Sequence, residues 1–195
     1  TPLFFRNVKK IVFIHEIAGK VWFKNISFPV ALVGYLLEPL SLILYRKTQF
    51  ITVSQSTKKD LTIHKIPAKN IEIVHNGMSK VSVPSYIKKE KTPTIIFLGR
   101  ISEDKGIADA FKAISLLQNH IKKLNFWIVG KEQETGIIES YLKKFAFVQD
   151  YHIKYFGFVN QREKFSLLKK SWILVHPSLK EGWGLSVIEA GSQKT

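Results

Sequence analysis

The stretch TIIFLGRISEDKGIADAFKAISLLQNHIKKLNFWIVG, residues 94–130, holds two apolar runs with a helical pattern between them. The runs Thr94–Leu98 and Leu124–Val129 are short, continuous and rich in β-branched and aromatic residues, as buried parallel strands are. Between them, residues Gly106–Gln118 place apolar side chains on one helical face. This order of strand, helix and strand predicts a parallel sheet with helices packed on it.

The alternation continues on both sides of this stretch. Towards the C-terminus we expect helices over Glu134–Phe147 and Gln161–Lys170, strands over Ile153–Phe156 and Trp172–Val175, and a helix start that carries Glu189. Towards the N-terminus we expect strands over Lys9–His15, Phe50–Val53 and Ile71–Val74, a helix over 26–45 broken near Pro39, and a helix over Ser56–Lys65 capped by Ser54. The fold class is therefore α/β, with doubly wound parallel sheets.

A change of composition separates two domains. Residues Ser79–Pro93 combine serines, prolines and lysines, which is typical of a linker. We place the boundary near residue 83. This gives a first domain over 1–82, a linker over 83–93 and a second domain over 94–195.

The composition limits the kinds of function. The 195 residues contain no Cys, which excludes a disulfide framework and thiolate metal sites. The net charge of +15 favours anionic partners such as nucleic acid, lipid headgroups or phosphorylated substrates, although a Lys-rich solvated surface is the simpler interpretation. The apolar stretch 26–45 is interrupted by Pro29, Glu38 and Pro39, so we expect a helix packed within the domain rather than a membrane span. Because Arg46 and Lys47 follow it, a role at a membrane surface stays open.

The segment HPSLKEGWGLSVIEAG, residues 176–191, concentrates the polar chemistry. Glu181 and Glu189 stand eight positions apart, one on a loop and the other in the helix that follows. The glycines between them allow close approach of the backbone to a ligand, and a helix N-terminus offers N–H donors to an anion. The segment predicts a phosphate site flanked by two carboxylates, with a hydrolase acid/base pair as an alternative.

Further candidates follow other predicted strands. Arg100 comes directly after the strand at 94–98 and Lys105 opens the next helix, so two cations meet the carboxyl edge of the sheet, where ligands of open α/β sheets bind. Two cations and a helix N-terminus are what a diphosphate requires. His15 ends the first strand in the same way, although a histidine that caps a strand is the plainer interpretation. Glycines at strand ends, at 99, 130 and 157, also suggest a ligand close to the backbone.

These residues carry a resemblance to a known family. The pairs Gly99-Arg100 and Lys105-Gly106, together with Glu181-Gly182-Trp183-Gly184-Leu185 and Glu189-Ala190, resemble the GT-B retaining glycosyltransferases of the family 4 type, the glycosyl transferases group 1. The spacing of the two glutamates fits that family's E-x7-E motif. The segments VFIHE, ITVSQSTKKDL and IEIVHNG in the first half are similar to the closing part of the family's acceptor-side domain.

The resemblance implies two Rossmann-like domains, the first incomplete and the second cut short, so we expect a fragment truncated at both ends with little or no activity of its own. It implies transfer of a hexose or similar sugar from a nucleoside-diphosphate-sugar donor, with retention, to a glycan or lipid-linked acceptor. By this resemblance, Arg100 and Lys105 bind the diphosphate and assist the leaving group, Glu189 binds the ribose, and Glu181 contacts the donor sugar. The backbone of Gly182, Trp183, Gly184 and Leu185 contacts sugar and phosphate. Val159 contacts the base, and His15 has an acceptor-side role.

The resemblance also bears on cofactors, partners and place in the cell. It implies no cofactor and no metal, since the two cations serve the leaving group and no Asp-x-Asp is present. We expect no nucleic-acid partner, a cytoplasmic location, and an anionic membrane surface at its inner face as a further candidate partner. The competing interpretation is a basic module that binds nucleic acid or membrane without catalysis.

Overall fold

The computed structural model describes residues 7–78, 81–145, 147 and 150–195. Its contacts divide the chain into two units, Thr1–Gly77 with Glu181–Trp183, and Met78–Lys180 with Gly184–Thr195. The domain ranges 1–82 and 94–195 and the linker 83–93 stay predictions. Residues 1–6 of the predicted first domain, and Ser79 and Lys80 at the start of the linker-like stretch, lie outside the described residues.

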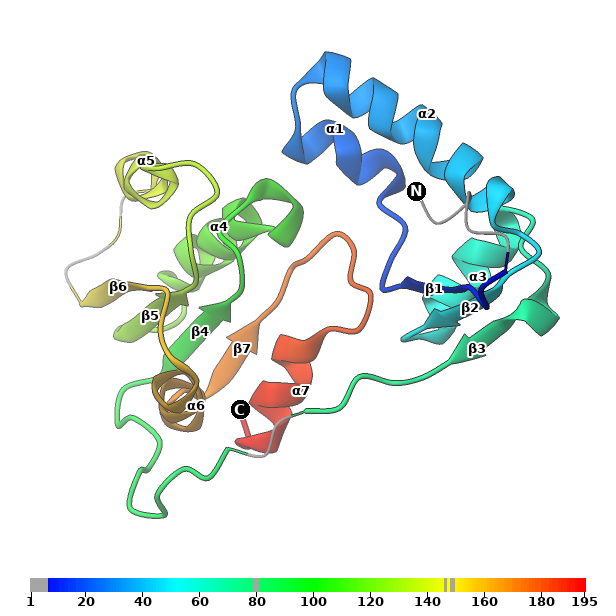
Figure 1. Cartoon of the computed structure of the whole chain (residues 1–195). Coiled ribbons are helices and arrows are strands. Elements are labelled where there is room, and N and C mark those ends of the chain that lie inside the picture. The colour runs from blue at the N-terminus through cyan, green and yellow to red at the C-terminus, as the bar shows by residue number, and fades with distance from the viewer. Residues whose placement is uncertain (1–6, 79–80, 146, 148–149) are drawn as a thin grey trace. The chain divides into compact units, whose positions relative to one another are not determined.

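The first unit is built on a parallel sheet of three strands in the order β1-β2-β3 (Figure 1). Its elements are, in chain order, β1 (Ile11–Ile14), η2 (Gly19–Val21), α1 (Trp22–Asn25), α2 (Phe28–Leu44), β2 (Gln49–Thr52), α3 (Gln55–Ile63), η3 (Ala68–Asn70) and β3 (Ile71–Ile73). In the register of the sheet, Phe50 lies beside both Val12 and Ile71. The three predicted strands are confirmed to within two residues at each end.

One apolar cluster joins this sheet to its helices. Phe50 of β2 and Ile71 of β3 pack with Leu42 of α2 and Leu61 of α3, and all four are buried. Val12 and Ile14 add the inner side of β1, while Ile11 and Phe13 alternate to the other side and are half-exposed. The predicted cap of α3 is also confirmed, since Ser54 Oγ accepts the backbone N–H of Thr57 at 3.2 Å.

Helix α2 differs from its prediction in two ways. It runs through Pro39 without a break, because a proline removes one backbone hydrogen bond, and the helix has eleven residues before Pro39 and five after it. Only Ala31 and Leu42 of the helix are buried, so it is not packed within the domain as expected. Its carboxylate, Glu38, accepts the backbone N–H groups of Ala18 and Gly19, each at 2.8 Å.

The second unit contains a parallel sheet of four strands in the order β6-β5-β4-β7 (Figure 1). Its elements are β4 (Thr94–Leu98), η4 (Glu103–Lys105), α4 (Ile107–Leu117), β5 (Leu124–Val129), α5 (Ile137–Lys144), β6 (Tyr151–Gly157), α6 (Gln161–Lys170), β7 (Ile173–Val175) and α7 (Leu185–Ser192). The predicted α/β alternation is confirmed, and β4, β5 and α6 have the predicted bounds. Both sheets are parallel and Rossmann-like.

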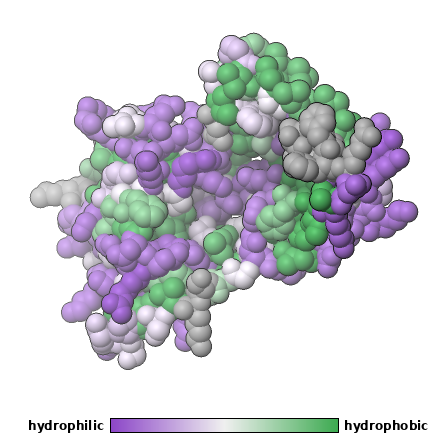
Figure 2. All heavy atoms as spheres, viewed as in Figure 1, coloured by the Kyte–Doolittle hydropathy of each residue, from purple (hydrophilic) through white to green (hydrophobic). Residues whose placement is uncertain are grey.

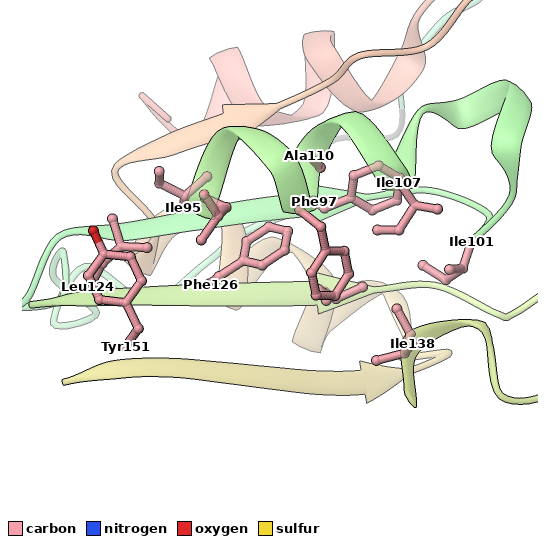
Figure 3. Packing of buried hydrophobic residues seen from close by; sticks show 12 residues of the cluster. Ile95, Phe97, Ile101, Ile107, Ala110, Leu124, Phe126, Ile138 and Tyr151 are labelled. Carbon is pink, nitrogen blue, oxygen red and sulfur yellow. The ribbon is translucent and has the colours of Figure 1, made fainter. Parts of the chain in front are cut away.

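Alternate residues of β4 build two cores on opposite faces of this sheet. Ile95 and Phe97 pack in one cluster with Phe126 of β5 (Figure 3). Phe111 of α4 belongs to the same cluster. Ile96 and Leu98 point to the other face, where the helices are α6 and α7; their buried partners there are Leu167, Leu168 and Ala190. Helices therefore cover both faces, as the doubly wound prediction requires.

Helix α5 begins three residues later than predicted. Gly136 has φ +88°, and the carboxylate of Glu132 accepts the N–H groups of Gly136 at 3.2 Å and Ile138 at 2.8 Å. This carboxylate takes the place of an N-cap and sets the start of the helix. The predicted end of the helix at Phe147 is also too late, since α5 ends at Lys144; Ala146, within the predicted range, lies outside the described residues.

Apolar side chains are exposed along α2, where Figure 2 shows green atoms. Phe28 is 70% exposed and Leu36 59%. Even so, within the described ranges of the chain there is no helix with both the length and the apolar character that a membrane crossing needs.

Candidate functional site

The strand order of the second sheet marks a point where ligands bind in this class of fold. From β4 the chain adds β5 and β6 on one side and then β7 on the other. The order therefore reverses between β4 and β7, and the crevice at the carboxyl ends of these two strands is the usual ligand site of an open α/β sheet. The loops that follow β4 and β7 flank this point.

Arg100 lies at the start of the loop after β4, and hydrogen bonds hold one edge of its guanidinium group. Its Nη2 donates to Asp104 Oδ2 at 2.8 Å, and its Nε donates to Ser102 Oγ at 3.3 Å. Ser102 Oγ donates in turn to Asp104 Oδ1 at 2.5 Å. The Asp104 side chain is 8% exposed and that of Arg100 is 51% exposed. A buried carboxylate thus orients a guanidinium whose outer half stays in solvent, where it can meet an anion.

The loop after β7 packs against the loop that carries both cations. Leu179 donates its N–H to the carbonyl of Asp104 at 2.9 Å. Gly106 follows Lys105 with φ +73°, and a Cβ added there would lie 2.2 Å from the carbonyl oxygen of Pro177. The two loops therefore lie in close contact, and this contact depends on residue 106 having no side chain.

Residue 130 must be glycine for a structural reason that the sequence did not reveal. A Cβ at this position would lie 1.7 Å from the carbonyl oxygen of Gly99, so the β5 loop is packed backbone to backbone against the β4 loop. The chain itself, rather than a ligand, requires this glycine.

Helix α7 carries Glu189 into the interior of the second unit. The helix starts after Gly184, which has φ +69°, and Leu185 is its first residue, 41% exposed. Glu189 lies in the second turn, where its Oε1 accepts from Nζ of Lys164 in α6 at 2.5 Å. Both side chains are largely buried, with 8% of Glu189 and 16% of Lys164 exposed. Since a carboxylate accepts several hydrogen bonds, this ion pair leaves Glu189 with further capacity to accept.

Lys164→Met is expected to lower the free energy of unfolding of the second unit by about 2 kcal/mol, because the buried Glu189 carboxylate loses its partner. Urea denaturation measures the change. Lys143→Met is the control, since it removes an ion pair to Glu139 whose side chains are both exposed, and it is expected to leave stability nearly unchanged. Equal losses in the two variants would contradict a special cost for the buried charge. Recovery in Lys164→Met/Glu189→Gln would support it.

Val159 lies just beyond β6 and is partly buried. It packs against the cluster that contains Ile96, Leu168 and Ala190. Its place at the carboxyl end of a strand agrees with the sequence, and its contact with a base stays a prediction.

Four candidates belong to the first unit. His15 follows the end of β1, is exposed, and has its Nδ1 3.5 Å from Nδ2 of Asn76. The group Glu181, Gly182 and Trp183 falls in the same unit. Within it, a Cβ at residue 182 would lie 2.4 Å from the His15 carbonyl oxygen, and the Trp183 ring stacks on His75 with centroids 4.6 Å apart. Glu181 is partly buried.

Sequence reasoning missed Ser102, Asp104 and Lys164. Asp104 stands four positions after Arg100, so a local pairing could have been noticed. Lys164 is 25 positions from Glu189 and on another helix, and no local pattern predicts that contact. In the parts of the chain that the structure describes, no group of three or more acidic, His or Cys side chains is placed to hold a metal ion.

Comparisons with known proteins bear on the fold and the family. An uncharacterised glycosyltransferase of Methanocaldococcus jannaschii, MJ1607, is 27% identical over 75% of this chain and 40% of its own. TarM of S. aureus, solved with UDP, α-GlcNAc-glycerol and fondaparinux, has a TM-score of 0.71 and 18% identity over 95% of this chain and 35% of its own. WaaG, a glycosyltransferase involved in lipopolysaccharide biosynthesis, has a TM-score of 0.67 and 16% identity over 94% of this chain and 54% of its own.

The chain thus spans about half or less of the length of these relatives. The structural neighbours establish the GT-B type of fold. The family model named glycosyl transferases group 1 matches residues 80–195, which include the whole β4–β7 crossover, its two loops and α7. The chain belongs to the glycosyl transferases group 1 family.

Proposed function

We propose that the protein to which this chain belongs transfers a hexose or similar sugar from a nucleoside-diphosphate-sugar donor to an acceptor hydroxyl, with retention of configuration. Family membership supports sugar transfer. The observation that carries the donor assignment is the pair of cations, Arg100 and Lys105, on the loop at the point where the strand order reverses.

The proposal gives each candidate residue a part of the substrate. Arg100 and Lys105 bind the diphosphate, Glu189 accepts from the ribose hydroxyls, and Glu181 contacts the donor sugar. The backbone from Gly182 to Leu185 faces sugar and phosphate, Val159 touches the base, and His15 serves the acceptor side. In support, Asp104 already orients Arg100, and Glu189 is buried in the second turn of α7.

The proposed transfer reaction depends mainly on electrostatic stabilisation of the leaving group. The bond between the sugar C1 and the diphosphate oxygen breaks, the acceptor oxygen bonds to C1 and its proton is released. Negative charge grows on the departing nucleoside diphosphate, and two cations stabilise that charge more in the transition state than in the ground state. Because Asp104 holds the guanidinium in place before the reaction, little reorganisation is needed. The proposal requires neither a metal nor a cofactor.

The acceptor is a glycan or a lipid-linked molecule, and the enzyme works at the cytoplasmic face of a membrane. Two features of the first unit support this part. The exposed side chains of α2 are mostly apolar, and the basic pair Arg46 and Lys47 follows the helix after Tyr45. Such a combination suits the surface of an anionic bilayer.

Calorimetric titration with UDP, GDP and ADP tests the donor assignment. We chose UDP as the first probe because TarM was solved with it. Arg100→Ala and Lys105→Ala are each expected to weaken binding of the preferred diphosphate by about tenfold to a hundredfold, because each removes a charge-assisted contact. Lys112→Ala removes the same charge from the exposed side of α4 and is expected to leave the affinity unchanged. Unchanged affinity in both site variants would refute the diphosphate assignment.

A further inference from the structure

A second concentration of positive charge lies in the first unit, and it includes Arg46 and Lys47, the basic pair beyond α2. Six residues line a hollow of ≈ 490 Å³: Arg46, Lys47, Lys65, Pro67, Lys69 and Asn70. They come from the connection that enters β2 and the connection that enters β3. In a parallel sheet these connections lie at the edge where strands begin, and His15 lies at the opposite edge, where β1 ends.

The two connections are tied to each other, so the hollow has a defined shape. Nδ2 of Asn70 donates to the carbonyl of Arg46 at 3.1 Å. Thr48 closes its own turn through two bonds to the carbonyl of Tyr45, from N–H at 2.7 Å and from Oγ1 at 2.6 Å. The N–H of Asn70 donates to the carbonyl of Pro67 at 2.8 Å.

Lys65 lies two residues beyond the end of α3, the helix that leads into this hollow. It has φ +64°, a conformation that glycine usually takes after a helix and that costs other residues free energy. The next residue, Ile66, is buried in the core of the unit and donates its N–H to the carbonyl of Leu61 at 3.1 Å. The buried Ile66 fixes the turn, and the turn holds the lysine at the rim.

The charges in the hollow have one sign. Four of the six described residues that line it are cations, and none of the six is acidic. Like charges gathered in a concave surface repel one another and focus a positive potential, and an anion bound there removes that cost. Arg46 adds a planar guanidinium that can bind two oxygens of one phosphate, while each lysine acts as a point charge.

We infer that this hollow binds a phosphate group, either on a lipid headgroup or on a soluble phosphorylated molecule. The inference goes beyond sugar transfer and does not depend on it, since none of the six residues takes part in the proposed donor site. Phosphate fits better than a carboxylate because its several oxygens can meet cations from two connections at once.

The test is a titration of the isotope-labelled chain with inorganic phosphate, followed by amide NMR shifts and compared with sodium chloride at the same ionic strength. We expect saturable shifts at the amides of residues 45–48, 64–66 and 68–70 with phosphate only. In Lys65→Asn/Lys69→Gln the affinity is expected to fall about tenfold. Asn is chosen at residue 65 because it tolerates positive φ. The amide spectrum shows in the same sample whether the variant folds, and Arg46→Gln gives a second test of the same site.

The matched control is Lys24→Gln/Lys59→Gln, which removes two exposed lysines of the same unit outside the hollow. Its phosphate affinity is expected to equal that of the unmodified chain. Equal losses in the two double variants, or equal shifts with chloride, would overturn the inference, because general attraction to a basic surface would then explain them. Binding of UDP through Arg100 is measured separately, so failure of one proposal is distinguishable from failure of the other.

A second arm identifies the source of the phosphate. The chain is sedimented with vesicles of phosphatidylcholine alone and of phosphatidylcholine with phosphatidylglycerol. Binding to the anionic vesicles that is lost in Lys65→Asn/Lys69→Gln and kept in the control would identify a lipid phosphate. Loss of phosphate shifts without any difference in vesicle binding would identify a soluble phosphorylated ligand. Absence of both phosphate shifts and site-dependent vesicle binding would refute the site.

Discussion

Phe111→Ala is expected to lower the free energy of unfolding of the second unit by about 3–5 kcal/mol. Phe111 of α4 is fully buried and joins strand and helix layers. Its ring lies edge-on to Phe126 of β5 with centroids 5.5 Å apart and stacks on Tyr141 of α5 at 5.3 Å. Truncation therefore removes buried area and leaves a cavity among side chains that come from three elements.

Urea denaturation followed by circular dichroism gives the change for this unit. With a denaturant slope of about 1–3 kcal/mol per molar urea, the midpoint is expected to fall by more than about 1 M. Leu116→Ala is the control, because Leu116 lies on the same helix and is 61% exposed. Its midpoint is expected to stay almost constant. A Phe111→Ala midpoint no lower than that of Leu116→Ala would show that this ring is not central to the core.

Gly106→Ala is expected to cost at least about 2 kcal/mol of stability and to abolish measurable nucleoside-diphosphate binding. The residue has φ +73°, where a side chain is unfavourable by about 1–2 kcal/mol. The added Cβ would also meet the Pro177 carbonyl at 2.2 Å, and that atom is backbone, so relief requires the loops to separate. Separation displaces Lys105 and breaks the bond from Leu179 to Asp104.

Gly191→Ala is the matched control in the same unit. Gly191 lies in α7 without positive φ, and a Cβ there meets nothing within 4 Å. Because alanine favours helix, we expect unchanged binding and a gain of about 0.5–1 kcal/mol. Thermal melts and UDP calorimetry measure both variants. Normal binding by Gly106→Ala would show that the contact between the two loops is not needed for the donor site.

The second unit was the more predictable from sequence because its signals are local. Strands such as Thr94–Leu98 are buried on both faces and read as continuous apolar runs, and the turns between elements are short. The start of α5 was missed because Glu132, outside the helical pattern, bonds to the N–H groups that open the helix. The path of α2 was missed because the effect of Pro39 depends on the stability of the turns around it.

The candidate site was predictable in its positions and less so in its contacts. Arg100 and Lys105 follow a recognisable strand, and their place beside the β7 loop follows from the strand order. The buried pair of Glu189 with Lys164 arises from the packing of α6 against α7, which depends on tertiary structure and leaves no spacing to detect. The same holds for the close backbone packing at Gly130.

The carboxylate of Glu38 has a consequence for how α2 is oriented. Apolar side chains are spread around this helix rather than gathered on one face, so the hydrophobic effect alone favours no single rotation about its axis. The two hydrogen bonds that Glu38 accepts from the N–H groups of Ala18 and Gly19 form in one rotation only. Any other rotation leaves a charge and two backbone donors without these partners. One polar residue thus selects a single rotation of α2 about its axis. The same two bonds fix the path of the chain after β1.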